Sequence, residues 1–224
     1  MADKVVLMRE AGGLDLSQVR KVLARDGVVS LNDDAGLFTT DEWALLEDGA
    51  VHPGLPYEHV LIGDAGEPNL VEVGRLMTDV DRPRIANADQ ARPMLEVLGS
   101  RDRLVLLAEL IGSGQVYMRR AQINRMHAGS FIGLHLDQDS NPDYTVAIVL
   151  QMGTKFDGGE FVVHPPHGAT VTVKPKYRSI TISRCDYPHE VRRVGSGIRT
   201  SLVYFVADHD SANRRRSFAA TTSA

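Results

Sequence analysis

The chain has 224 residues, of which 43% are hydrophobic and 24% charged, a composition typical of folded globular proteins and unlike that of disordered or fibrous chains. Its net charge of −4 gives no overall attraction to nucleic acid or to an anionic membrane surface, which disfavours both as partners. The single cysteine, Cys185, excludes an intramolecular disulfide and any all-thiolate metal site, so a bound metal would need histidine and carboxylate ligands.

The N-terminal segment MADKVVLMREAGG lacks the basic and then apolar pattern of a secretory signal. No uninterrupted apolar run approaches the roughly 18 residues that a membrane-spanning helix needs. Because a lone cysteine also fits a reducing compartment, we expect a cytoplasmic protein.

The first hundred or so residues are expected to be helical with loops, beginning with a helix near residue 16. Leu16, Val19 and Leu23 recur at helical spacing. Gly27 is typical of the residue that follows a helix, and the β-branched pair Val28-Val29 after it predicts a strand.

Three more helices and one long loop are expected in the rest of this region. Residues 39–42, directly before Trp43, predict a helix with a capped start. A stretch rich in Gly and Pro over residues 49–69 predicts a long surface loop, and loops of that length are often functional. Two helices should follow, near residues 89–98 and 102–111.

From residue 115 onward the chain changes to eight short apolar runs divided by Gly, Pro, Asp and Asn. Such a block is typical of an antiparallel double sheet or barrel, including the jelly-roll class. The expected fold class is therefore mainly β with N-terminal helices, or α+β. We divide the chain into a helical and loop region at 1–114, a β core at 115–208 and a polar C-terminal tail at 209–224, all within one globular domain. Residues 213–224 of this tail are expected to be exposed to solvent.

In the first of these apolar runs, Arg120, Gln122, Asn124 and Met126 alternate onto one strand face. If that face points inward, its polar side chains would contact a ligand. If it points to solvent, it is an ordinary exposed face, and the sequence leaves both interpretations open.

His135 and Asp137 are two residues apart, so on a strand their side chains would project from the same face. Imidazole and carboxylate ligands suit iron, manganese or zinc, and a third ligand on one triangular face would leave positions for a co-substrate and dioxygen. His189, at the start of a later strand, is the candidate for that third ligand.

Ten residues after His189, Arg199 and Ser201 place a guanidinium and a hydroxyl on one face of the last strand. The planar fork of arginine matches a carboxylate through two hydrogen bonds, and serine adds one donor. A dicarboxylic keto acid that chelates a metal at one end would need such an anchor at its other end.

Several motifs follow one another in order between about residues 115 and 206. They are Asn124-Arg125-Met126, GSFIGLHLD ending at Asp137, FDGGEF at 156–161, Pro188-His189-Glu190-Val191 and GIRTSL at 197–202. In this order they resemble the double-stranded β-helix core of iron(II)- and 2-oxoglutarate-dependent dioxygenases, particularly the prolyl-4-hydroxylase-like branch. Many members of that branch have Lys where this chain has Arg199, so the basic character of the position is kept.

The resemblance implies an oxygenase that uses Fe(II), 2-oxoglutarate and O2, and that converts 2-oxoglutarate to succinate while it hydroxylates an unactivated C–H bond. Desaturation or ring formation of the substrate stays open. It implies that the metal ligands are His135, Asp137 and His189 and that Arg199 and Ser201 hold 2-oxoglutarate. From the polar strand face we add Asn124 as a further contact of this co-substrate.

Four residues are candidates for substrate contact: Arg120, His127, Gln138 and Asp139. Arg120 shares the polar strand face, and His127 precedes the turn at Gly129 near the expected mouth of the site. Gln138 and Asp139 directly follow a ligand. For His127 a hydrogen-bonded loop histidine is the favoured interpretation. A solvated loop explains Gln138 and Asp139 equally well.

Three functions remain to be distinguished. The first is oxidation of a small molecule such as a free amino acid or a natural-product intermediate, which a pocket closed by residues 49–69 and the N-terminal helices would favour. The second is a peptidyl or protein (prolyl-type) hydroxylase, which a wide cleft would favour. The third is a cupin-like metal-binding or hydrolytic protein, which Arg199 and Ser201 disfavour because it needs no carboxylate anchor. The oligomeric state stays open.

Overall fold

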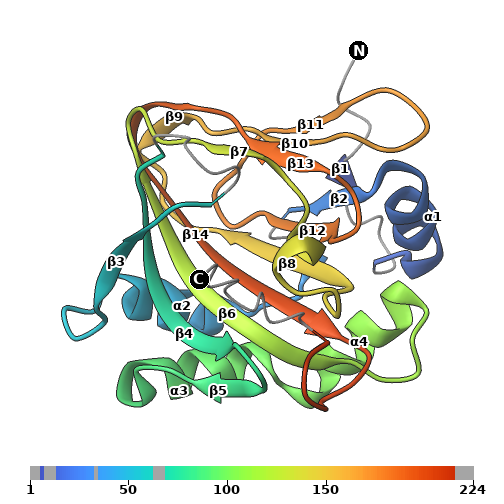
Figure 1. Cartoon of the computed structure of the whole chain (residues 1–224), viewed down its shortest axis with the longest axis horizontal. Coiled ribbons are helices and arrows are strands. Elements are labelled where there is room, and N and C mark those ends of the chain that lie inside the picture. The colour runs from blue at the N-terminus through green and yellow to red at the C-terminus, as the bar shows by residue number, and fades with distance from the viewer. Residues whose placement is uncertain (1–5, 8–13, 33–34, 63–68, 215–224) are drawn as a thin grey trace, which may run out of the picture.

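Two β-sheets face each other in the computed structural model, and helices pack against the outer face of the larger sheet (Figure 1). The structure describes residues 6–7, 14–32, 35–62 and 69–214. Within these ranges the larger sheet comprises β1 (Val6–Leu7), β2 (Val28–Leu31), β3 (Tyr57–Val60), β4 (Val71–Asp79), β5 (Pro83–Ile85), β6 (Tyr117–His127), β8 (Val146–Gln151), β9 (Phe156–Gly158), β12 (Ile180–Arg184) and β14 (Val194–Ala207). The smaller sheet comprises β7 (Ile132–His135), β10 (Phe161–Val163), β11 (Val171–Val173) and β13 (His189–Val191).

The helices are α1 (Leu16–Asp26), α2 (Thr40–Val51), α3 (Ala88–Leu98), α4 (Arg101–Ile111) and the single turn α5 (Asp137–Ser140). The four long ones confirm the helices expected from the sequence. Of the helices in the described ranges, none is long and apolar enough to cross a membrane.

The larger sheet has the strand order β1-β2-β12-β8-β14-β6-β4-β3, with β5 paired to β4 and β9 paired to β14, and the smaller sheet has the order β11-β10-β13-β7. Apart from the parallel pair β1 and β2, the pairings are antiparallel. The long strand β14 lies between β8 and β6. Two facing antiparallel sheets form the double-stranded β-helix, or jelly-roll, core that was expected.

Local caps set the starts of the first two helices. α1 is preceded by Asp15, whose carboxylate accepts a hydrogen bond from the Gln18 amide at 3.0 Å, and is followed by Gly27 with a φ of 73°. α2 starts with a reciprocal cap in which Thr39 and Glu42 each bond the other's backbone amide. Because these caps use residues close in the chain, both boundaries can be predicted from the sequence.

A large apolar core lies between the helices and the outer face of the larger sheet. Its buried members include Trp43, Leu46, Leu98, Leu110, Ile123, Ile148, Leu150, Leu202 and Tyr204. A smaller cluster includes Met126, Ile132, Phe161, Val191 and Val194, from both sheets. Side chains alternate along a strand, so every second residue of β6, β8 and β14 packs into the large core. The residues between them face the smaller sheet.

The expectation of helices and loops between residues 49 and 79 is wrong. α2 continues to Val51, Tyr57 pairs opposite Gly74 in β3 and β4, and β4 pairs in turn with β6. Residues 63–68 of the predicted loop lie outside the described residues. Pairing with β6 stabilises β4, and such long-range pairing leaves little trace in local composition. The boundaries drawn at 114 and 208 stay a prediction.

From residue 115 onward the described chain contains nine strands, β6 to β14, where eight were expected. The additional strand is β9, whose three residues pair with β14 beside Gly197. Three residues are too few for an alternating pattern to be visible in the sequence.

Residues 213–224 were expected to be exposed to solvent, but the described part of the tail, residues 209–214, is bound to the larger sheet. Arg119 donates to the carbonyl oxygens of His209 and Ser211, and Asn213 donates to Asp79. The backbone amide of Arg214 donates to the Asp143 carboxylate at 2.8 Å. Residues 215–224 lie outside the described residues.

Candidate metal centre and cavity

Three side chains meet at the edge of the smaller sheet where β7 ends and β13 begins. His189 lies directly opposite His135 in this antiparallel pair, and their ring centroids are 4.4 Å apart. With Asp137, they offer ligand atoms that all lie within 4.8 Å of one another. Asp137 was expected on the same strand as His135, which is wrong: β7 ends at His135, and Asp137 begins α5 after the extended residue Leu136. The extended Leu136 still brings the carboxylate to the same point.

The orientation of both imidazole rings is set by backbone carbonyls. Nδ1 of His135 donates to the Gly133 carbonyl at 2.8 Å, and Nδ1 of His189 donates to the Tyr187 carbonyl at 2.9 Å. Nε2 of each ring is thereby turned toward Asp137, at 3.6 Å and 3.5 Å from the carboxylate oxygens. Histidine metal ligands are commonly held in this way.

The electrostatics favour a carboxylate at Asp137. Burial alone would raise the pKa of Asp137, but the hydrogen bond with His135 and the charges of both histidines outweigh burial and lower it. Burial lowers the pKa of His189, whereas at His135 the contacts with Asp137 outweigh burial and raise the pKa. An ionised carboxylate beside two imidazoles is a donor set that suits a divalent transition metal.

This cluster lies in the wall of an open-mouthed cavity of about 410 Å³ that is lined by residues of both sheets. The polar residues in its wall are Arg120, Gln122, Asn124, His135, Asp137, Asp139, Ser140, His189, Arg199 and Ser201. The apolar residues are Val60, Leu61, Ile62, Ile132, Leu136, Ala147, Val149, Phe161, Val191, Val203 and Phe205. The polar face of β6 therefore points inward, which answers the question that the sequence left open.

Arg199 is the unusual group in this wall. It is 4% exposed, its Nη1 lies 3.5 Å from the Met126 sulfur, and its Nε has no hydrogen-bond partner. Burial lowers the pKa of Arg199 to about 10, so the side chain is still a cation at neutral pH. No carboxylate of the described chain forms an ion pair with it. A buried guanidinium without a counter-ion is costly, so the cavity is suited to an anionic ligand at this point.

Comparison with known proteins identifies the family. The model of the 2OG-Fe(II) oxygenase superfamily matches residues 121–207. A crystal structure of an oxidoreductase of the 2OG-Fe(II) oxygenase family from Burkholderia pseudomallei is 38% identical, and the match covers 94% of this chain and 99% of that chain with a TM-score of 0.85. The chain belongs to the 2OG-Fe(II) oxygenase family. Its cofactors are iron(II) and 2-oxoglutarate, with O2 as co-substrate.

Two more distant structures share the fold of this oxygenase. The epimerase SnoN in complex with Fe3+, alpha-ketoglutarate and nogalamycin RO is 16% identical over 93% of this chain and 91% of that chain, with a TM-score of 0.65. A Trichoplax adhaerens prolyl hydroxylase in complex with a peptide fragment of hypoxia inducible factor is 11% identical over 86% and 89%, with a TM-score of 0.64. At these identities the likeness shows the fold alone. No curated protein matches the oxygenase sequence significantly.

A chain of hydrogen bonds runs along the inward face of β6 in the oxygenase. Nε of Arg120 donates to Oε1 of Gln122 at 2.9 Å, and Nε2 of Gln122 donates to Oδ1 of Asn124 at 2.7 Å. Since the Asn124 oxygen is engaged, its Nδ2 is the group left to donate to a ligand. Gln122 was named on this face but not singled out, although its alternation with Arg120 and Asn124 was the available signal.

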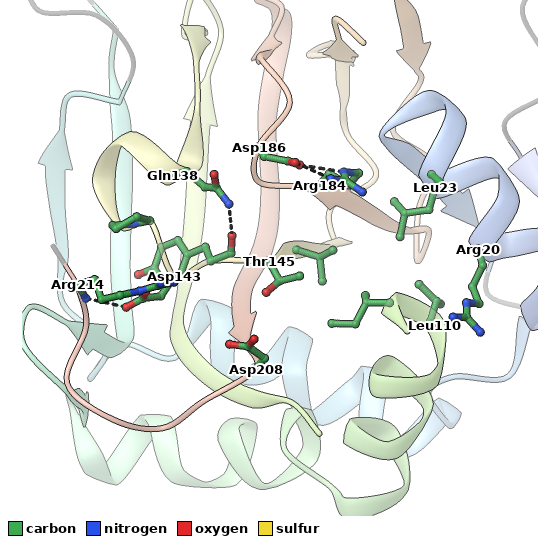
Figure 2. Close-up of a pocket in the computed structure, with 15 residues that line it drawn as sticks. Arg20, Leu23, Leu110, Gln138, Asp143, Thr145, Arg184, Asp186, Asp208 and Arg214 are labelled. Carbon is green, nitrogen blue, oxygen red and sulfur yellow. Dashed lines mark hydrogen bonds and ion pairs between the residues drawn. The ribbon is translucent and has the colours of Figure 1, made fainter. Parts of the chain in front are cut away.

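Two of the expected substrate contacts do not line the oxygenase cavity. His127 follows Met126 and so points to the opposite face of β6, where its Nε2 lies 3.2 Å from the Glu72 carboxylate. Gln138 donates to the Tyr144 carbonyl at 3.0 Å and lines a second cavity of about 400 Å³ next to α5 (Figure 2). Arg120 and Asp139 do line the first cavity.

Cys185 was expected to be a small buried hydrophobe without a chemical role. It is fully buried in a cluster with Tyr144 and Phe205, and burial raises the pKa of its thiol well above the usual value. A thiol that stays protonated is a poor nucleophile and a poor metal ligand. This environment fits a packing role for Cys185.

Proposed function

We propose that this oxygenase hydroxylates a C–H bond of a small molecule at an iron ion held by His135, Asp137 and His189. The observation that carries the proposal is one cavity that joins this cluster to a buried arginine without a carboxylate partner. When bound together, iron and 2-oxoglutarate supply the oxidising chemistry. The chain's own residues supply the binding and the orientation.

Arg199, Ser201 and Asn124 would hold 2-oxoglutarate by its distal carboxylate. Ser201 lies opposite Asn124 in the paired strands β14 and β6, one alternate position from Arg199, and both residues are buried. The guanidinium of Arg199 would donate two parallel hydrogen bonds, the Ser201 hydroxyl one, and Nδ2 of Asn124 one. Satisfying the unpartnered Nε of Arg199 is part of the stabilisation.

The apolar part of the remaining wall would exclude water from the reacting C–H bond. Ile132, Phe161 and Val191 approach from the smaller sheet's side, while Val149 and Val203 belong to the larger sheet. A cavity of about 410 Å³ falls within the range of pockets for small molecules. Val60, Leu61 and Ile62 add to its wall from the segment that precedes residue 63.

The experiment is an anaerobic titration of the protein with Fe(II) and then 2-oxoglutarate, followed by the visible charge-transfer band that a chelated keto acid produces. His135→Ala and His189→Ala should abolish the band and turnover, because two ligands rarely hold iron in an open geometry. His164→Ala is the matched control, since His164 pairs with Glu190 outside the cavity. Full activity in either ligand variant would refute the assignment.

Arg199→Ala should keep the iron site but raise the 2-oxoglutarate concentration for half-saturation about 10- to 100-fold, because a charge-assisted carboxylate contact is lost. Arg192→Ala, at an exposed position, is the control. An unchanged 2-oxoglutarate requirement would remove Arg199 from the site. Succinate release with proline-containing peptides, and none with small molecules, would favour the prolyl-type alternative.

A further inference from the structure

Two guanidinium groups, Arg199 and Arg120, line the same cavity at different positions along one strand pair. In the register of β6 and β14, Arg199 lies opposite Met126 and Arg120 lies opposite Phe205. Six residues of strand separate Met126 from Arg120, which corresponds to roughly 20 Å. One 2-oxoglutarate molecule with its distal carboxylate on Arg199 cannot also engage Arg120, so a second cation is left for another ligand.

Arg120 keeps donors available for such a ligand. Its Nε is engaged by Gln122 at 2.9 Å, and its guanidinium carbon lies 5.8 Å from the centroid of the Phe205 ring. The Tyr144 hydroxyl is a further neighbour. Across the described ranges, no carboxylate lies within ion-pair distance of Arg120. These contacts fix the direction of the planar group while its charge stays uncompensated.

A carboxylate lines the cavity as well. Asp139 is exposed, lies in α5 two residues after Asp137, and forms no ion pair with any cation of the described chain. Asp139 and Arg120 do not pair with each other either, although both lie in the wall of one cavity. Ala147, Val149 and Val203 add an apolar surface to the wall of the same cavity.

We infer that the substrate is a small zwitterion of amino-acid type, with its carboxylate on Arg120 and its amino group on Asp139. The inference rests on the proposed function, because it takes Arg199 as the 2-oxoglutarate anchor. A planar guanidinium oriented by an amide matches a carboxylate through two hydrogen bonds, and a single exposed carboxylate suits an ammonium group. The carbon skeleton would lie on the apolar part of the cavity wall, within reach of the iron cluster.

The test is anaerobic calorimetry of the Fe(II)- and 2-oxoglutarate-loaded protein, which measures binding without turnover. The probes are the twenty proteinogenic L-amino acids, each beside its C-terminal amide and its N-acetyl derivative. We expect at least one free amino acid to bind and to stimulate succinate release in air. Its amide and its N-acetyl derivative should each bind at least about tenfold more weakly, because each removes one charged contact.

Two variants test separately the recognition of the carboxylate by Arg120 and of the amino group by Asp139. Arg120→Met should weaken binding of the free amino acid about 10- to 100-fold and remove the preference over the amide. Asp139→Asn should remove the preference over the N-acetyl derivative. Arg192→Met and Asp157→Asn, at exposed positions outside the cavity wall, are the matched controls and should keep both preferences.

The outcomes separate the two proposals. If the charge-transfer band forms but no free amino acid binds, or the amide binds as well as the acid, the zwitterion inference is overturned and the proposed function stands. The zwitterion inference is also overturned if Arg120→Met still binds the free amino acid more tightly than its amide. If the band does not form in folded, metal-loaded protein, the proposed function fails and the inference fails with it.

Discussion

Gly159 determines how closely the turn after β9 can approach the side chain of Arg199. Its φ is +70°, and a Cβ atom at this position would lie 2.7 Å from Cδ of Arg199. Both glycines of the FDGGEF motif have positive φ, but at Gly159 the close neighbour is the proposed anchor itself. The motif therefore has a direct connection to the cofactor site.

Gly159→Ala should displace Arg199 and raise the 2-oxoglutarate concentration for half-saturation about tenfold, the effect of weakening one charge-assisted contact. It should also lower the free energy of unfolding by about 1–2 kcal/mol because of its backbone conformation. Gly168→Ala is the matched control: its φ is +124°, but an added Cβ would meet nothing within 4 Å. Equal 2-oxoglutarate requirements in the two variants would contradict the role given to Gly159.

The candidate site residues were predictable where their sequence signal is local. His135, Asp137, His189, Arg199 and Ser201 come from short motifs, and the structure brings all five to one cavity. The substrate contacts were harder, because they depend on side-chain direction. His127 points away from the cavity because side chains alternate along β6. Gln138 was expected in a loop beside the metal, but it lies in the helical turn α5 and donates to the Tyr144 carbonyl instead.

At the scale of elements, a buried ion pair connects four separate segments of the chain. Arg119 of β6 pairs with Asp79 of β4 at 2.8 Å, and both side chains are fully buried. Asn141, which follows α5, donates to the same Asp79 carboxylate at 2.9 Å. The C-terminal segment completes the set, as Asn213 and the carbonyls of residues 209 and 211 bond to the pair.

Arg119→Met should lower the free energy of unfolding by about 3–5 kcal/mol, because the Asp79 charge would stay buried without its partner. Urea denaturation followed by circular dichroism measures the change. Arg184→Met is the control: Arg184 pairs with Asp186 at the surface, and the loss of such a pair changes stability by about 0–1 kcal/mol. Similar decreases in the free energy of unfolding in both variants would mean that the buried pair stabilises the fold no more than a surface pair does.

Asp143 connects the C-terminal segment to the loop after α5, and this contact depends on pH. Burial would raise the pKa of Asp143, but hydrogen bonds from Arg214 and His209 outweigh burial and lower it. A carboxyl group whose pKa is lower in the folded state stabilises the fold above its ordinary pKa near 4, and this stabilisation is lost as the pH falls through the lowered value.

Asp143→Asn should therefore lower the free energy of unfolding at pH 7, by about 1–3 kcal/mol. The difference in the free energy of unfolding between this variant and the unsubstituted protein should become smaller as the pH falls below about 4. Urea denaturation at pH 7, 5 and 3 measures it, and Asp157→Asn at an exposed position is the control. A difference that is constant with pH would show that the contact is not governed by this carboxylate.

Helices and strands were predictable where residues close in the sequence determine them. The capped helices α1 and α2 were expected from nearby residues, and so were the alternating strands of the core. β3 and β4 were missed because pairing with distant β6 creates them, within a region rich in Gly and Pro. Local propensity is weak beside such tertiary pairing.

For the whole molecule, the packing leads us to expect that the helices and the first strands unfold together with the β core. β2 pairs with β12 and β4 pairs with β6, while the helices cover the apolar outer face of the larger sheet. A fragment of residues 115–214 should therefore not fold, because it would expose that face and leave two strand edges unpaired. Circular dichroism and NMR dispersion, compared with the full chain, provide the test. Cooperative unfolding of the fragment would contradict this expectation.

The register of β6 against β14 places side chains in successive rungs: Met126 with Arg199, Asn124 with Ser201, Gln122 with Val203, and Arg120 with Phe205. The first two rungs belong to the proposed 2-oxoglutarate site, and the last two face the rest of the cavity. The residues proposed to bind 2-oxoglutarate are thus separate from those that face the rest of the cavity. Substitutions restricted to the last two pairs are expected to change which substrates the enzyme accepts and to leave its iron and 2-oxoglutarate sites unchanged. The scaffold is therefore suited to directed evolution.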